Sequence, residues 1–165
     1  MKEIIPPVDK QKILEELTRE KFVRKTNNGN KEIYIFSHED SPNLMLEVGR
    51  LREISFREAG GGTGMQTDID EFDISESPYK QLIVWCPEEQ EIVGGYRFIE
   101  GSVIPFKDDQ PDCAVSELFI YSERFIRDFL PYTIELVMRV NAITVFEVSE
   151  KRLAARFDVA NTVPS

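Results

Sequence analysis

A glycine-rich loop between a helical pattern and an acidic run constrains this chain more than any other feature. Residues 50–73 read Arg-Leu-Arg-Glu-Ile-Ser-Phe-Arg-Glu-Ala-Gly-Gly-Gly-Thr-Gly-Met-Gln-Thr-Asp-Ile-Asp-Glu-Phe-Asp. Glycine loses more backbone entropy on ordering than other residues, so the glycines within 60–64 need a physical reason. We expect either that the loop moves over a ligand or that its backbone approaches another group closely, and we expect this segment to form the front half of a substrate pocket.

Length and composition indicate one globular domain. The chain has 165 residues, of which 41% are hydrophobic and 30% charged, enough to bury a core. Its formal net charge of −10 argues against nucleic-acid binding, because phosphate binding requires an excess of Lys and Arg. A local basic pocket for a phosphorylated or carboxylated ligand remains compatible with that charge.

The cysteines and the apolar runs indicate the compartment. Cys86 and Cys113 lie far apart in sequence, which favours two reduced thiols over a disulfide or a metal pair. The N-terminus lacks the apolar run of a signal peptide, and no run reaches the roughly 20 residues that span a bilayer. We expect a cytoplasmic protein whose membrane contact, if any, is peripheral.

The hydrophobic pattern predicts a mixed α/β (α+β) fold with a mostly antiparallel sheet flanked by helices. Helices are expected after caps at Asp9 and Ser41 and over 122–130, the first of them ending with Phe22 and Val23. Strands are expected over 32–37, 81–86, 91–99 and 132–137, a short strand or extended segment over 115–121, turns at 27–30 and 87–90, and a loop over 100–112.

Charged residues within this pattern are the candidates for a site. The acidic run consists of Asp68, Asp70, Glu71 and Asp73. Metal ligands, general bases and a solvated turn are all open readings, although the run lacks the central glycine and closing glutamate of a calcium loop. Arg52 and Arg97 lie in apolar surroundings, where a guanidinium must be paired or bind something. They either pair with the acidic run or position a ligand carboxylate, and both can hold together.

Glu135 is the candidate general base. It lies in an apolar segment, where strand alternation turns it away from Ile134 and Leu136, towards either solvent or a cleft. In a cleft, desolvation would raise its pKa towards a useful range for proton transfer. The single histidine, His38, falls in an expected loop and gives little support to a histidine-based triad.

Four separated segments, in this order, resemble the hemolysin-like N-acyltransferases of the GNAT superfamily. The segments are Arg50-Leu-Arg-Glu-Ile-Ser-Phe56, Asp68-Ile-Asp-Glu-Phe-Asp73, Gly94-Gly-Tyr-Arg-Phe98 and Pro131-Tyr-Thr-Ile-Glu-Leu136. That group includes glycine- and ornithine-lipid synthases, and the acyl-homoserine-lactone synthases are more distant relatives. The resemblance covers about residues 1–136 and implies a GNAT-like domain over that range.

The resemblance implies transfer of a 3-hydroxy fatty acyl group to the amine of glycine or ornithine in aminolipid synthesis. The acyl donor would be acyl carrier protein or acyl-CoA, with no metal or organic cofactor and no nucleic-acid partner. Glu135 matches the position of the proposed base. The pocket positions matched by the resemblance are Arg52, Phe56, Asp70, Asp73 and Arg97.

Residues 137–165 depart from the family pattern, which continues with Gly-Arg-Ser after the segment 131–136. We expect a divergent tail with a strand at 142–148 and a helix at 149–157, and an exposed sheet edge that favours a homodimer. An interrupted reading frame would explain the departure and predicts an incomplete C-terminal half and an inactive chain. The alternatives are a non-catalytic ligand-binding or interaction remnant of the family, and a small acidic module that clasps a cationic ligand.

Overall fold

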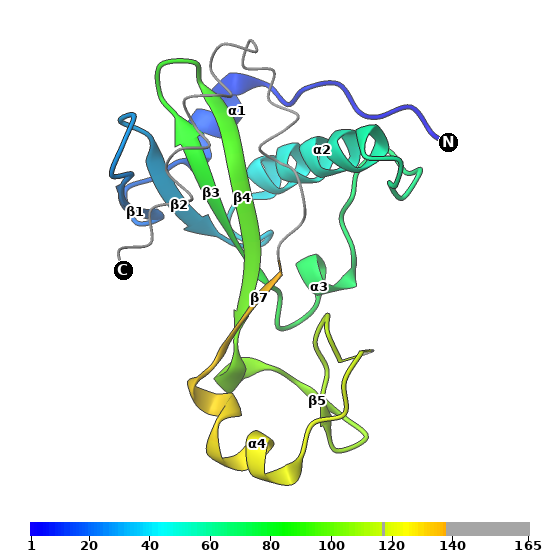
Figure 1. Ribbon diagram of the computed structural model, residues 1–165. Coiled ribbons are helices and arrows are strands. Elements are labelled where there is room, and N and C mark those ends of the chain that lie inside the picture. The colour runs from blue at the N-terminus through cyan, green and yellow to red at the C-terminus, as the bar shows by residue number, and fades with distance from the viewer. Residues whose placement is uncertain (117, 138–165) are drawn as a thin grey trace, which may run out of the picture.

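A five-stranded antiparallel sheet forms the centre of the computed structural model, which describes residues 1–116 and 118–137 (Figure 1). The strand order is β1-β2-β3-β4-β7. The strands are β1 (Phe22–Lys25), β2 (Glu32–Phe36), β3 (Lys80–Cys86), β4 (Glu91–Glu100) and β7 (Ile134–Val137). A separate hairpin consists of β5 (Phe106–Lys107) and β6 (Gln110–Pro111). The predicted mixed α/β class with an antiparallel sheet is confirmed.

The helices vary widely in length. They are α1 (Lys10–Glu16), α2 (Pro42–Glu58), α3 (Glu71–Ile74) and α4 (Glu123–Asp128), with 3₁₀ turns η1 (Gly101–Val103) and η2 (Leu130–Tyr132). Helix α2 lies along the sheet and is the long helix of Figure 1. Its apolar positions pack against the strands in one core cluster, made of Ile13, Tyr34, Phe36, Leu44, Met45, Val48, Ile83, Trp85 and Ile92.

The N-terminal part follows the predicted pattern with one correction. Asp9 caps α1 by accepting a hydrogen bond from the Gln11 amide, as predicted. Phe22 and Val23 do not end this helix but begin β1, so that prediction was wrong. The turn at 27–30 joins β1 to β2 as a hairpin, in which Phe22 pairs with Tyr34 and Lys25 pairs with Glu32.

The start of α2 is capped from outside the helix. Ser41 occupies the cap position, as predicted, but its side chain makes no capping hydrogen bond. Instead the Glu16 carboxylate accepts hydrogen bonds from the amides of Asn43 (3.0 Å) and Leu44 (2.7 Å). A carboxylate at a helix N-terminus satisfies free amides and favours the helix dipole, so Glu16 ties α1 to α2.

The C-terminal part of the described chain has a smaller core and less regular structure than the pattern predicts. This second core contains Tyr79, Ile99, Ile104, Cys113 and Leu130. The described residues of 115–121 form turns and irregular backbone in place of a strand, and 100–112 holds η1 and the β5–β6 hairpin in place of a loop. Strand β7 begins at Ile134, two residues later than expected, because η2 occupies residues 130–132. The predicted strand and helix at 142–157 lie outside the described residues.

The double glycine in β4 lies beside a β-bulge. The β3–β4 register shifts between Val84 and Trp85, opposite the segment that ends in Gly94. A Cβ on Gly95 would lie 2.7 Å from the Leu82 carbonyl oxygen and 3.3 Å from Ile83 Cγ2. Only glycine fits this close contact between the two strands.

Gly95→Ala is therefore expected to destabilise the protein by about 1–3 kcal/mol, because the Cβ overlaps a backbone atom that cannot move without disturbing the sheet. Urea unfolding measures the change. Gly61→Ala is the matched control, since a Cβ there lies 3.6 Å from its nearest neighbour. Equal stability of the two variants would contradict the packing argument.

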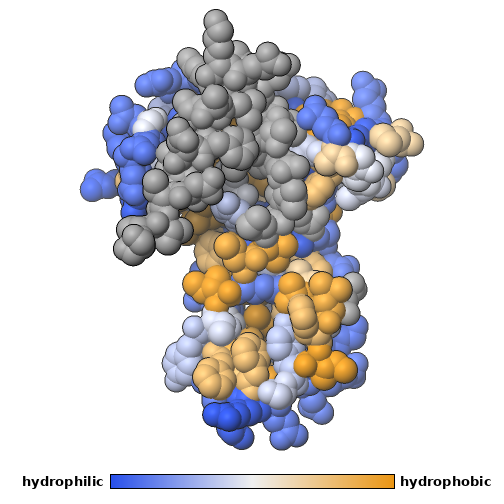
Figure 2. All heavy atoms as spheres, viewed as in Figure 1, coloured by the Kyte–Doolittle hydropathy of each residue, from blue (hydrophilic) through white to orange (hydrophobic). Residues whose placement is uncertain are grey.

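Apolar side chains are unusually exposed in the lower part of the molecule (Figure 2). They include Leu118, Phe119, Ile120, Phe129, Tyr132, Ile134 and Leu136. Surface of this kind marks a contact surface in folded proteins. Among the described helices, none combines the length and hydropathy needed to cross a bilayer.

Candidate functional site

A buried cluster of ion pairs connects α2 to the acidic run and to β3. Arg52, on α2, donates from Nη1 to Asp73 Oδ2 at 2.8 Å and from Nη2 to Gln81 Oε1 at 2.6 Å. Gln81 Nε2 in turn donates to Asp73 Oδ1 at 3.0 Å. The Asp73 side chain is 0% exposed, so its charge is balanced inside the protein and not by solvent.

Arg97, on β4, is the second cation of this cluster. Its Nη1 donates to Asp70 Oδ1 at 2.6 Å and lies 3.3 Å from Asp73 Oδ1. Its guanidinium lies over the rings of Phe72 and Tyr79, 5.5 and 5.2 Å from their centroids, within cation–π range. Burial alone would lower the pKa of Arg97, but Asp70 and Asp73 outweigh it and raise that pKa above its usual value.

The acidic run is a short helix with a capping box. The Asp70 side chain accepts from the Phe72 amide at 3.1 Å, and the Asp73 side chain accepts from the Asp70 amide at 3.2 Å. Each carboxylate therefore serves both the start of α3 and an arginine. Asp68 and Asp73 are buried, which excludes the solvated turn as a description of the whole run. Within the described ranges, no group of three or more His, Cys, Asp or Glu side chains is arranged to hold a metal ion.

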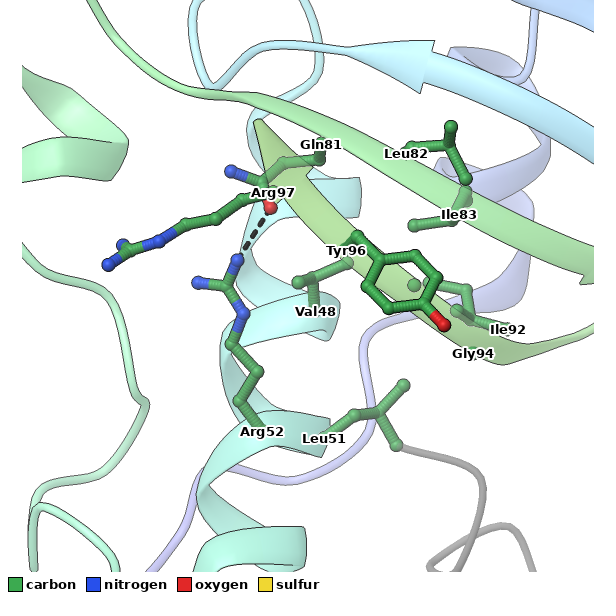
Figure 3. A pocket seen from close by; sticks show the side chains of 11 residues that line it. Val48, Leu51, Arg52, Gln81, Leu82, Ile83, Ile92, Gly94, Tyr96 and Arg97 are labelled. Atoms are coloured by element: carbon green, nitrogen blue, oxygen red, sulfur yellow. Dashed lines mark hydrogen bonds between the residues drawn. The ribbon is translucent and has the colours of Figure 1, made fainter. Parts of the chain in front are cut away.

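A small cavity lies between α2 and the β3–β4 hairpin, with the two arginines at one end (Figure 3). Its volume is about 30 Å³. Its walls are otherwise apolar, formed by Val48, Leu51, Leu82, Ile83, Ile92, Gly94, Gly95 and Tyr96, and Gln81 joins the arginines at the polar end. Arg97 Nε, buried next to this space, has no hydrogen-bond partner among the residues of the described chain.

The glycine loop is held by one buried carboxylate. Glu53, on α2, accepts hydrogen bonds from the Thr63 amide (3.0 Å), the Thr63 hydroxyl (2.7 Å), the Gly64 amide (2.8 Å) and Arg57 Nε (2.7 Å). Gly62 has φ +97°, and a Cβ there would meet Arg57 Cγ at 2.8 Å and Glu53 Oε1 at 3.3 Å. The glycines therefore let the loop backbone pack closely around the Glu53 side chain. The sequence predicts a close backbone approach at this loop, and in the structure the group approached is a side chain of the same protein.

Glu135, on β7, lies in the second core and apart from the cavity. Its Oε2 accepts a short hydrogen bond from the Tyr79 hydroxyl, and its Oε1 accepts from the Val115 amide at 3.0 Å. Tyr79 connects Glu135 to the cluster, because its ring lies under the Arg97 guanidinium.

The predicted residues thus separate into three groups. Arg52, Asp70, Asp73 and Arg97 form the cluster, and within the described part of the chain Glu135 is connected to it through Tyr79. Phe56 lies one turn beyond Arg52 on α2 and is not among the described residues that line the cavity.

Sequence reasoning missed Gln81, Glu53 and Tyr79. The sequence signal for Gln81 is a glutamine at the start of an apolar strand. The signal for Glu53 is a glutamate shortly before a glycine loop. Tyr79 carried none, because its role depends on partners far away in the chain.

Comparisons with known proteins agree with this architecture. The profile of the acetyltransferase (GNAT) domain matches residues 51–133, just over half of the chain. That range contains the whole ion-pair cluster, the glycine loop and the β3–β4 hairpin. No solved structure matches the chain significantly.

Two curated relatives carry the name glycine N(alpha)-acyltransferase. One, from Phocaeicola vulgatus, is 51% identical over 137 residues, which cover 82% of this chain and 42% of the relative. The other, from Bacteroides thetaiotaomicron, is 53% identical over 137 residues, 82% of this chain and 41% of the relative. The chain therefore spans less than half the length of these relatives. By its domain match and its antiparallel α/β fold, the chain belongs to the GNAT acetyltransferase family.

Proposed function

We propose that this chain supplies the amino-acid side of an N-acyltransferase that transfers a 3-hydroxy fatty acyl group to the amine of glycine. The observation that supports it best is the buried Arg52–Asp73–Arg97–Asp70 cluster beside an apolar cavity, within the matched domain. The names of the two relatives support glycine over ornithine as the acceptor.

The charges of the cluster suit a zwitterion. At neutral pH an amino acid presents a carboxylate and an ammonium group within a few bonds, and the cluster presents arginines beside aspartates. Arg97 Nε, a buried donor without a partner in the described part of the chain, is the group to which we assign the acceptor carboxylate, because an unsatisfied buried donor costs free energy. Asp70, whose side chain is 32% exposed, is the carboxylate of the cluster that an ammonium group can reach.

The transfer step follows from the chemistry of amines and thioesters. The ammonium group loses a proton to Glu135, or to a water molecule that Glu135 orients, and the free amine attacks the thioester carbonyl carbon. The new C–N bond forms as the C–S bond breaks, and the thiolate of the acyl carrier takes up a proton. The step changes no oxidation state, so it needs no redox cofactor. We propose acyl carrier protein or acyl-CoA as the acyl donor, with no organic cofactor and no metal.

The test is an assay of the purified full chain with 3-hydroxyacyl carrier protein and isotope-labelled glycine. N-acylglycine detected by mass spectrometry is the expected product. Arg97→Lys keeps the charge but loses the planar fork of donors, so we expect it to raise the KM for glycine at least tenfold. Lys107→Ala, on the β5–β6 hairpin, is the surface control and should behave as wild type.

The relative from Bacteroides thetaiotaomicron serves as the positive control for acyl transfer to glycine. If it turns over and this chain does not, catalysis by this chain is refuted. Saturable glycine binding without turnover would then favour the alternative of a non-catalytic binding protein, and neither binding nor turnover would refute the assignment of the cluster as an amino-acid site.

A further inference from the structure

We infer that Tyr79 is a positioning residue that couples the arginine cluster to the Glu135 carboxylate. Its ring contacts the cation that we assign to the acceptor, and its hydroxyl holds the carboxylate that we assign as base. The catalytic meaning of this coupling rests on the proposed function, whereas the coupling itself follows from the geometry.

The ring of Tyr79 is fixed on two sides. Tyr79 is 1% exposed and immediately precedes β3. The Arg97 guanidinium lies 5.2 Å from its centroid, and Phe72 packs edge-on at 5.6 Å with an interplanar angle of 71°. A displacement of Arg97 by a ligand therefore acts on this ring, because the ring packs between the Arg97 guanidinium and Phe72.

The hydroxyl of Tyr79 is directed at Glu135. It accepts a hydrogen bond from the Ala114 amide at 2.9 Å and donates its single proton to Glu135 Oε2. Since the amide already occupies one lone pair, the remaining direction for the O–H bond is towards the carboxylate. Burial, followed by the hydrogen bond to Glu135, raises the pKa of Tyr79 well above its usual value, so the hydroxyl keeps its proton at neutral pH.

The second oxygen of Glu135 is held by the backbone. Val115 donates its amide to Glu135 Oε1 at 3.0 Å. Each carboxylate oxygen keeps a further lone pair, so the two hydrogen bonds orient Glu135 without removing its capacity to accept a proton. Together they fix the carboxylate between β7 and the turn at 113–116.

Among the described residues, Cys113 and Tyr121 are further titratable groups that interact with Glu135. Burial, and the charge of Glu135, raise the pKa of Cys113, and burial with Cys113 raises the pKa of Tyr121 to about 12. Both side chains are therefore uncharged at neutral pH. Tyr79 is the tyrosine whose hydroxyl donates to the carboxylate, whereas the Tyr121 hydroxyl lies 3.8 Å from Cys113 Sγ.

The experiment measures the pKa of Glu135 by NMR in protein labelled with ¹³C at the glutamate carboxyl carbon, with Glu135→Gln to assign the signal. Tyr79→Phe keeps the ring over Arg97 and removes only the hydroxyl. We expect it to raise the pKa of Glu135 by about one unit, a tenfold change in proton affinity, because a donor to the ionised form is lost. Tyr121→Phe is the matched control and should leave the pKa unchanged.

A second comparison tests the coupling to the cluster. Arg97→Lys preserves the charge but changes the contact with the Tyr79 ring. It should shift the Glu135 signal when Tyr79 is present and leave it in place in the Tyr79→Phe background. An unchanged pKa in Tyr79→Phe, or an Arg97→Lys shift that persists without the hydroxyl, would overturn the inference.

An activity assay distinguishes a failure of this inference from a failure of the proposed function. In an active protein, Tyr79→Phe should move the acidic limb of the kcat/KM profile in step with the NMR pKa and leave the KM for glycine within about twofold. A chain without turnover refutes the proposed catalysis but leaves the NMR comparison fully decisive for the coupling.

Discussion

Asp73→Asn is expected to destabilise the protein by about 3–5 kcal/mol, the cost of removing one partner from a buried ion pair. Asp73 receives hydrogen bonds from Arg52, Gln81 and the Asp70 amide and lies 3.3 Å from Arg97. The asparagine keeps the size of the side chain but removes the charge. The buried guanidinium groups of Arg52 and Arg97 then both lose their ion pair with Asp73.

Urea unfolding of Asp73→Asn against wild type measures this effect. The matched control is Glu100→Gln, which removes the exposed ion pair of Lys80 and Glu100 at the same 2.8 Å separation. Exposed pairs contribute about 0–1 kcal/mol, because solvent screens them. A loss below about 1 kcal/mol in Asp73→Asn would show that the cluster does not require its central carboxylate.

Glu53→Gln is expected to destabilise the protein by about 2–3 kcal/mol and to loosen the glycine loop. The carboxylate accepts from two amides, a hydroxyl and an arginine, and it is 0% exposed. A glutamine presents one oxygen and one NH₂ group, so at least one of the loop donors loses its acceptor, and hydrogen bonds to a charged group are worth about 1.5–3 kcal/mol. Hydrogen exchange at Thr63 and Gly64 should accelerate in parallel.

The loss of stability in Glu53→Gln is expected to depend on pH. Burial alone would raise the pKa of Glu53, but the hydrogen bonds from Thr63, Arg57 and Gly64 lower it below 4.5. A carboxyl group with a lowered pKa adds stability above the pKa of the unfolded chain and loses it as the pH falls through the folded value. The difference in stability between wild type and Glu53→Gln should therefore be constant from about pH 5 to pH 7 and shrink below about pH 4. A difference that stays constant down to pH 3 would contradict the role of the ionised carboxylate.

Local pattern predicted much of the upper part of the fold. The cap at Asp9, the turn at 27–30 and the hairpin at 81–99 are decided by neighbouring residues, and the structure has them where the sequence predicts. The pairing of the two arginines with the acidic run was also predictable, because a buried guanidinium needs an opposite charge. The lower part was harder: residues 115–121 look like a strand by composition, but Cys113 and Val115 are held in a turn by Ser116 and Glu135.

The sequence by itself indicated the family, through four separated segments that resemble the GNAT N-acyltransferases, and it indicated the ion pairs of Arg52 and Arg97, because an apolar core cannot bury an unpaired guanidinium. Only the tertiary structure decided which groups act together. Tyr79 and Glu135 are 56 positions apart, and the loop glycines close on Glu53 instead of a ligand. Contacts of this kind depend on how β3, β4 and β7 align in one sheet, and that alignment follows from the packing of the whole domain, which no local pattern encodes.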